Sequence, residues 1–145
     1  MNSPETIDVL NRLYAIHNRS LPMYLSFAVP FTMGKSDKAS TALGHVVEDQ
    51  KLMVDRLGEL ILDLGGDLQP GEFPMVFTSL HDLGIDYLIG QVILDLKRDI
   101  AIFDHCANQL NLVPMAKALA EEALGAAKGH LDSLEEVVSS KSSTH

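Results

Sequence analysis

The chain between residues 65 and 77 reads GGDLQPGEFPMVF, and it separates two long stretches of helical character. Two adjacent glycines favour the left-handed conformation that ends a helix, and Pro70 and Pro74 cannot continue one. A connection of this length is too long for a tight turn between antiparallel helices. We therefore expect this segment to travel the length of a helical bundle, which makes the helices on its two sides parallel.

Helical periodicity extends from this segment in both directions. Apolar residues recur at intervals of three and four from about residue 37 to 64, and again from about 78 to 110. Ser36-Asp37 and Thr78-Ser79 are the candidate N-caps of these two helices. No alternating β-branched stretch and no Asn-Gly turn is present, so the sequence gives no strand signal.

Two outer helices complete the expected bundle. Ser3-Pro4-Glu5 is typical of a helix start, and the first helix is expected from about 4 to 28 with a kink at Pro22. The last helix is expected to begin at Pro114 and to end near 138, where the bundle ends and a disordered polar tail, 139–145, follows. Short connections pair each outer helix with an inner one. The prediction is an all-α bundle of two antiparallel helical hairpins joined by a long crossover.

The length and net charge of the chain limit the number of domains and the kinds of partner that it can have. A chain of 145 residues fits one domain, and its net charge of −9 repels phosphate backbones and anionic lipid, so we expect no nucleic acid and no membrane partner. No run of 18 apolar residues is present, and the N-terminus lacks the features of a signal peptide. We expect a cytoplasmic location.

Two stretches resemble a known family. Residues 53–66, MVDRLGELILDLGG, are similar to the end of the second helix of bacterioferritins and related proteins. Residues 128–135, KGHLDSLE, are similar to the run around the metal-ligating histidine of their fourth helix. The resemblance implies a ferritin-like four-helix bundle over about residues 5 to 138. It also implies a di-iron centre, which in this family needs a Glu from two helices and a Glu-x-x-His from each of the other two.

Most of the six iron-ligand positions that the resemblance implies carry the wrong residue. No Glu-x-x-His occurs anywhere in the sequence, and only Asp99 and His130 among the six could still bind iron. The ordinary di-iron centre is therefore expected to be absent. The six positions are Arg12, Gln50, Met53, Asp99, Ala127 and His130.

Other histidines offer a displaced metal site. His17 lies five residues after Arg12, and His45 lies five before Gln50, so both move by about 7.5 Å in the same direction along antiparallel helices. With Glu48, the two imidazoles could hold zinc or iron. The alternative is a pair of partly buried histidines that form hydrogen bonds to Tyr14, Glu48 or Asp49. The complete set of metal-ligand candidates is His17, His45, Glu48, Asp99 and His130.

The sequence also leads to expectations for three small residues. Cys106 lies in an apolar stretch and is expected to be a buried small side chain rather than a reactive thiol. Gly125 and Gly129 cost about 1 kcal/mol each in a helix. We expect them to allow close approach of another backbone, within the bundle or across a dimer interface; a pocket for a flat ligand is the alternative.

Three hypotheses for function remain open. The first is a ferritin-like structural or binding module without a working di-iron centre, without enzymatic activity or a cofactor, and assembled as a homodimer. The second is a metal-binding oxidoreductase or iron-handling protein that uses iron or zinc at the displaced site. The third is a helical scaffold for an unidentified protein partner.

Overall fold

The computed structural model describes residues 3–28, 38–79 and 84–142, and these ranges contain helices and connections but no strand. The prediction of an all-helical chain is confirmed. The side chains are described from 4 to 26, 38 to 78 and 84 to 139. The elements are α1 Ser3–Asn18, α2 Leu21–Ala28, α3 Lys38–Asp63, the 3₁₀ helix η2 Met75–Ser79, α4 Ile85–Gln109 and α5 Pro114–Ser142.

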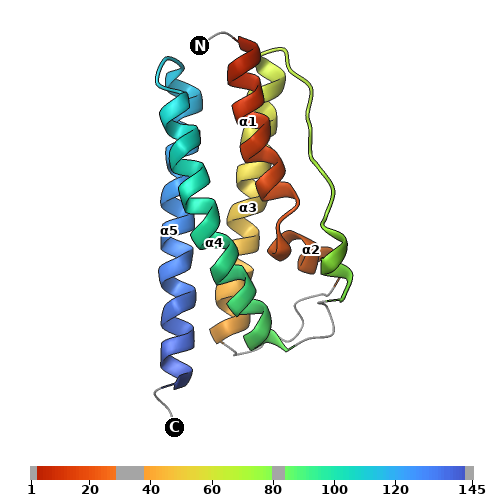
Figure 1. Ribbon diagram of the computed structural model, residues 1–145, viewed down its shortest axis with the longest axis vertical. Helices are drawn as coiled ribbons and strands as arrows, with labels where there is room; N and C mark the ends of the chain where they lie inside the picture. Colours follow the sequence, from red (N-terminus) through yellow and green to blue (C-terminus); the bar gives the residue numbers. More distant parts are fainter. Residues whose placement is uncertain (1–2, 29–37, 80–83, 143–145) are drawn as a thin grey trace.

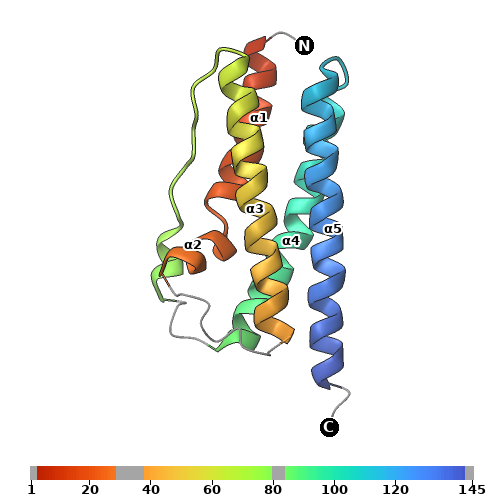
Figure 2. The same cartoon turned by 180° about the vertical axis from the view of Figure 1, so that it is seen from behind.

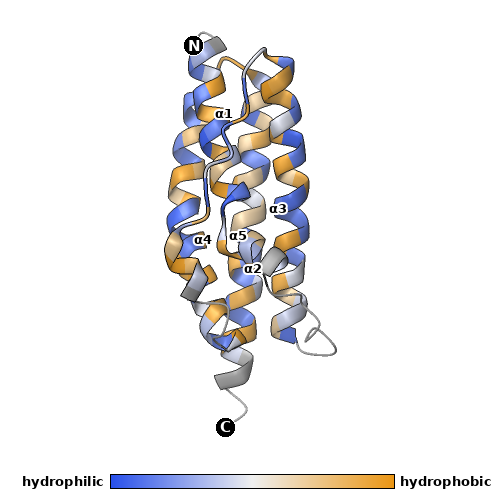
Figure 3. Ribbon diagram, turned by 90° about the vertical axis from the view of Figure 1, so that its right-hand side faces the viewer, coloured by the Kyte–Doolittle hydropathy of each residue, from blue (hydrophilic) through white to orange (hydrophobic). Residues whose placement is uncertain are grey.

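The four long helices lie side by side (Figures 1 and 2). α1 lies beside α3, and α4 lies beside α5, while α3 also packs along α5. In Figure 1, α1 and α5 run downward and α3 and α4 run upward, and the short α2 lies across one side of the bundle. Apolar and polar residues alternate along each long helix in Figure 3, and the apolar ones meet in one core. Fully buried members of this core include Leu10, Leu43, Leu57, Ile89 and Leu134.

Residues 65 to 74 form a strap along the outside of α1 (Figure 1). The buried side chain of Asn11 holds it: Nδ2 donates to the carbonyl of Asp67 at 2.9 Å, and Oδ1 accepts from the backbone N–H of Gln69 at 2.9 Å. A strap without regular structure has free backbone groups, and one buried amide satisfies two of them. The strap leads to η2, at the level of α2.

The predicted end of the second long helix at Gly65-Gly66 is confirmed. Gly65 has φ of +86°, and its N–H donates to the carbonyl of Leu62 at 3.0 Å. The N–H of Gly66 donates to the carbonyl of Ile61 at 2.9 Å. These two bonds and the left-handed glycine make a Schellman motif, which satisfies carbonyls that have no partner inside the helix.

The prediction of one kinked helix from 4 to 28 is wrong, because α1 ends at Asn18 and a separate α2 begins at Leu21. Pro22 would clash with the carbonyl of Asn18 in a continuous helix and could donate no hydrogen bond to it. Ser20 starts the new helix: its Oγ accepts a hydrogen bond from the N–H of Met23 at 3.3 Å. The chain can therefore change direction between the two helices (Figure 1).

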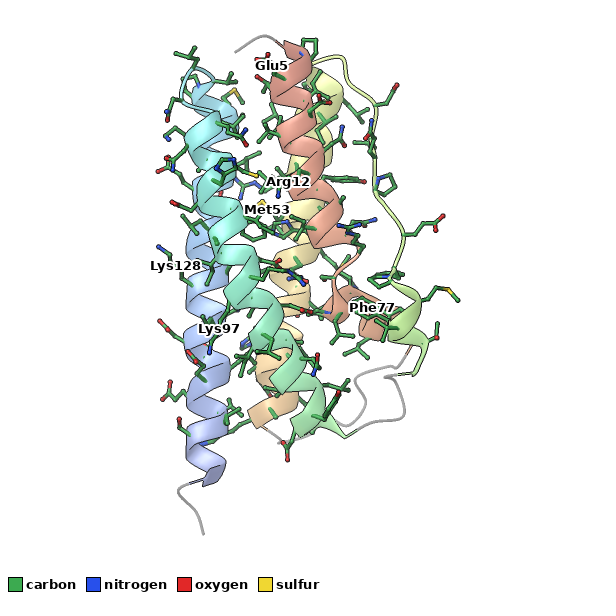
Figure 4. All side chains as sticks on the ribbon, in the orientation of Figure 1. Glu5, Arg12, Met53, Phe77, Lys97 and Lys128 are labelled. Carbon is green, nitrogen blue, oxygen red and sulfur yellow. The ribbon has the colours of Figure 1, made fainter. Side chains whose placement is uncertain are left out.

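The predicted start of the third long helix at Thr78-Ser79 is also wrong. These residues end η2, and α4 begins at Ile85. The Thr78 hydroxyl donates back to the carbonyl of Met75 at 2.7 Å and so does not cap a following helix. Phe77 is buried, and its ring centroid lies 5.6 Å from that of Tyr24 on α2. Aromatic packing thus holds this turn against α2 (Figure 4).

Two other sequence-based expectations concern the chain ends and Cys106. The last helix extends to Ser142 rather than to about 138, and the remainder of the predicted tail, 143–145, lies outside the described residues, as does the predicted Ser36-Asp37 cap. Cys106 is fully buried, as expected, and burial raises the pKa of its thiol. No described helix is long and apolar enough to cross a membrane.

Candidate functional site

A small cavity lies at the centre of the bundle, between all four long helices. Its volume is about 20 Å³. That is room for about one water molecule. We call it the central cavity; the residues that define it here are His17, Gln50, Met53, Phe103, Ala127 and His130.

His17 enters the central cavity from α1 as a buried, neutral imidazole. Its Nδ1 lies 2.7 Å from the carbonyl oxygen of Leu13, and its ring stacks on Phe103 with centroids 4.9 Å apart. A carbonyl only accepts, so Nδ1 carries the proton and Nε2 holds the lone pair. Burial lowers the pKa of His17, against a smaller raising effect of the bond to Leu13. The ring is thus held by packing and by its own helix.

His130 forms a link between α5 and α3. Its Nε2 lies 2.6 Å from Oδ2 of Asp49, and the imidazole is 15% exposed while the carboxylate is 55% exposed. A second link between these helices lies farther along, where Arg56 and Glu122 form an ion pair at 2.6 Å. The histidine that the resemblance identifies as an iron ligand therefore contacts a carboxylate of the neighbouring helix.

The structure does not assemble the displaced metal site predicted from His17, His45 and Glu48. His17 is buried, whereas His45 and Glu48 are exposed, and His45 lines a separate surface groove near Glu136. Among the described residues, no three His, Cys, Asp or Glu side chains lie close enough together to hold a metal ion. A shift of five residues rotates a helical side chain by about 140° from its first position, because each residue turns about 100°. The prediction considered only the movement of about 7.5 Å along the helix axis and not this rotation of the side chain around it.

A much larger cavity lies between α1, the start of α2, η2 and α4. Its volume is about 640 Å³. Its lining includes Arg12, Arg19 and Arg98, three of the four arginines in the chain. We call it the arginine cavity; the residues that define it here are Arg12, Arg19, Leu21, Phe77, Val92 and Asp99. Arg12 and Phe77 are labelled in Figure 4.

Asp99 is a buried acid in the wall of the arginine cavity. Its side chain is 8% exposed, and one oxygen, Oδ1, lies 3.3 Å from Nη2 of Arg98. Burial raises the pKa of Asp99 to about 6, and Arg98 and Arg19 oppose that rise while Asp95 adds to it. Desolvation of the charged form outweighs both guanidinium groups.

The two cavities together contain all six positions that the resemblance assigns to iron ligands. Met53, Ala127 and His130 line the central cavity, and Arg12 and Asp99 line the arginine cavity. Gln50 lines both, as does Leu96. Figure 4 labels Met53 and Arg12. Residues spaced widely along the sequence thus meet at adjoining cavities, with few of the acids and imidazoles that iron requires.

Sequence reasoning missed the arginine cavity, although a signal for it was present. Arginines are rare in this chain, and Arg12 and Arg19 lie two helical turns apart on one face. The cavity was not predictable without the break after Asn18, which moves the next helix away from the axis of α1.

The prediction that Gly125 and Gly129 meet another backbone inside the bundle is wrong for the described part of the chain. Both are exposed, and a Cβ added at either would have no heavy atom within 4 Å. The dimer interface stays a prediction.

No family model matches the chain, and comparisons with curated proteins and with solved structures find no match.

Proposed function

We propose that this chain is a ferritin-like bundle that has lost its di-iron centre and acts as a non-enzymatic small-molecule binding module. One observation carries the proposal. The six positions that the resemblance assigns to iron ligands line two adjoining cavities. At the central one, Met53 and Ala127 supply neither carboxylate nor imidazole, and neighbouring side chains leave a space of only about 20 Å³.

The course of the chain supports the ferritin-like part of the proposal. α1 lies beside α3 and α4 lies beside α5, and the strap and η2 connect α3 to α4 along the outside of the bundle (Figure 1). Ferritin-like folds have a bundle of this kind with one long crossover. The break between α1 and α2 is a departure from a single first helix.

The arginine cavity supports the binding part of the proposal. Small-molecule sites are concave, mostly apolar, and about 300 to 1,000 Å³ in volume. The arginine cavity, at about 640 Å³, lies in that range and combines apolar side chains with a few charged groups. A bundle that only held its helices together would not need a cavity of this size, because protein interiors are normally close-packed.

Iron loading tests the proposal. The purified protein is incubated with Fe(II) in air and desalted, and its iron is measured by mass spectrometry. We expect well under two irons per chain, and two retained irons would refute the proposal. A variant with Arg12→Glu, Gln50→Glu, Met53→His and Ala127→Glu restores the implied ligands and is expected to retain more iron than the wild type. If it folds and retains none, the ferritin-like register is wrong.

The pair Asp49 and His130 favours a second candidate, a metal-binding protein that handles iron or zinc. The two side chains are 2.6 Å apart, and both line the central cavity that His17 enters. A metal there would have two adjacent protein ligands and would need further ones from water or substrate. Zinc titration of the wild type and of His130→Ala, followed by calorimetry, distinguishes this candidate: binding of one zinc that is lost in the variant would support it.

A further inference from the structure

We infer that the arginine cavity binds an organic monocarboxylate with an apolar body, with its carboxylate at Arg12 and its apolar part against Val76 and Tyr87. The inference rests on the proposed binding function and adds the class of the ligand. Its starting point is a concentration of positive charge in a protein whose net charge is −9. Three of the four arginines line one cavity, and the fourth, Arg56, pairs with Glu122 on the surface.

Two of these arginines, Arg12 and Arg19, lie within ion-pair distance of no acidic side chain in the described part of the chain. Arg98 lies 3.5 Å from Asp95 and 3.3 Å from Asp99, so its charge is already compensated. Arg12 and Arg19 form no ion pair with any other residue in the described ranges 3–28, 38–79 and 84–142. Arg19 still interacts electrostatically with Asp99 and lowers its pKa. Burial raises the pKa of the Cys106 thiol above its ordinary value of 9.0, against a smaller lowering effect of Arg12, so the thiol carries no charge near neutral pH. Arg12 is therefore the strongest candidate for binding an anion.

The charge of the lining decides how much negative charge a ligand should carry. Three arginines and two aspartates give the cavity a formal charge of +1 when both acids are ionised. A monoanion neutralises that charge, whereas a phosphate ester would place a second negative charge near Asp99. Carboxylates also fit the planar fork of a guanidinium group, which can donate two parallel hydrogen bonds to them.

The apolar residues that line the cavity indicate that the ligand carries an apolar group besides its carboxylate. Leu21, Val92 and Leu96 lie beneath its surface and are nearly inaccessible to solvent, whereas Val76 and Tyr87, which also line it, are 61% and 52% exposed. An apolar group that enters this space leaves water at about 25 cal/mol for each Å² of its surface. A small hydrophilic anion, such as acetate, would gain nothing from this wall.

The cavity is held open by the local structure around the break between α1 and α2. Ser20 caps α2 and donates a hydrogen bond from its Oγ to Oε1 of Gln50 on α3 at 2.6 Å. Phe77 packs against Tyr24 and thereby fixes the other wall. Because α2, α3 and η2 are tied to one another, the walls are formed before a ligand arrives, which reduces the entropy cost of binding.

Calorimetric titration with decanoate tests the inference. Decanoate should bind one site per wild-type chain, and Arg12→Gln should weaken the affinity about tenfold. Arg56→Gln is the matched control, because it removes the arginine outside the cavity, and it should bind decanoate as the wild type does. Decanol and decyl phosphate, which share the chain but not the charge, should each bind at least about tenfold more weakly than decanoate. Circular dichroism confirms that the variants are folded.

Three results would overturn the inference: no saturable binding of decanoate, equal affinity of the Arg12→Gln and Arg56→Gln variants, or tighter binding of decanol or decyl phosphate. None of these results bears on the proposed loss of the di-iron centre, because the iron content of the protein tests that loss separately. Two irons per chain would instead refute the proposed function, whatever decanoate does. The failures of the two proposals are thus distinguishable.

Discussion

Replacing Asp99 by Asn should stabilise the protein at pH 8 and leave it unchanged near pH 4. The carboxyl group is buried in the wall of the arginine cavity, and its pKa is raised from 3.8 to about 6 by desolvation. The folded state therefore binds the Asp99 proton more tightly than the unfolded state does. Stability from this group is greatest below pH 3.8 and is lost as the pH rises to about 6.

The size of the effect follows from that difference in pKa. At about 1.4 kcal/mol for each pH unit, ionising Asp99 in the folded state costs up to about 3 kcal/mol at pH 8. Asn has the same shape and no charge, so it avoids this cost. The pKa of about 6 already includes the opposing effect of Arg98, whose side chain is 64% exposed, so loss of this contact adds little further cost. An exposed ion pair contributes about 0 to 1 kcal/mol. We expect a net gain of about 1 to 3 kcal/mol at pH 8.

Urea unfolding followed by circular dichroism at pH 4, 6 and 8 measures this gain. Asp104→Asn is the control, because Asp104 lies on the same helix but is exposed. The difference between the Asp99→Asn variant and the wild type should increase with pH, whereas the control should differ little from the wild type at every pH. If Asp99→Asn destabilises the protein at pH 8, then the carboxylate is stabilised by groups that outweigh its burial, and the reasoning fails.

Three further predictions concern single residues. Gly125→Ala should raise the free energy of unfolding by about 0.5 to 1 kcal/mol, because a Cβ there meets no atom within 4 Å; a loss of stability in thermal unfolding would indicate a close neighbour, such as a partner chain. Gly65→Ala should destabilise the protein by about 1 kcal/mol, since φ at this position is +86°, and equal melting temperatures would contradict the role of the Schellman motif. Cys106 should react with Ellman's reagent far more slowly in the native protein than in guanidinium chloride, because it is buried and the pKa of its thiol is raised; comparable rates would show that the core opens readily.

Local patterns predicted the helices well where the signal lay within a few residues. The glycine pair 65–66 fixed the end of α3, and apolar spacing identified the four long helices. The break after Asn18 was missed although Ser20-Leu21-Pro22 is itself a helix-start pattern. Apolar spacing continued through Pro22, and it outweighed the start signal in the prediction.

The candidate site was predictable only in part, because it depends on the rotation of helices and on packing across the chain. The six positions from the resemblance do line adjoining cavities, since their spacing along each helix keeps them on inner faces. The orientation of His45 was predicted wrongly, because a residue five positions along a helix from Gln50 is also rotated around the helix axis. The arginine cavity needed the packing of Phe77 against Tyr24, and nothing in the local sequence of either residue reports that contact.

Anomalous scattering from crystals soaked in Fe(II) locates each bound iron and so shows whether the bundle can hold an iron pair. Met53, Ala127 and Arg12 should leave the centre of the bundle unable to hold one. We expect no paired peaks between α1, α3, α4 and α5. Two peaks about 3.5 to 4 Å apart beside Met53 would contradict it.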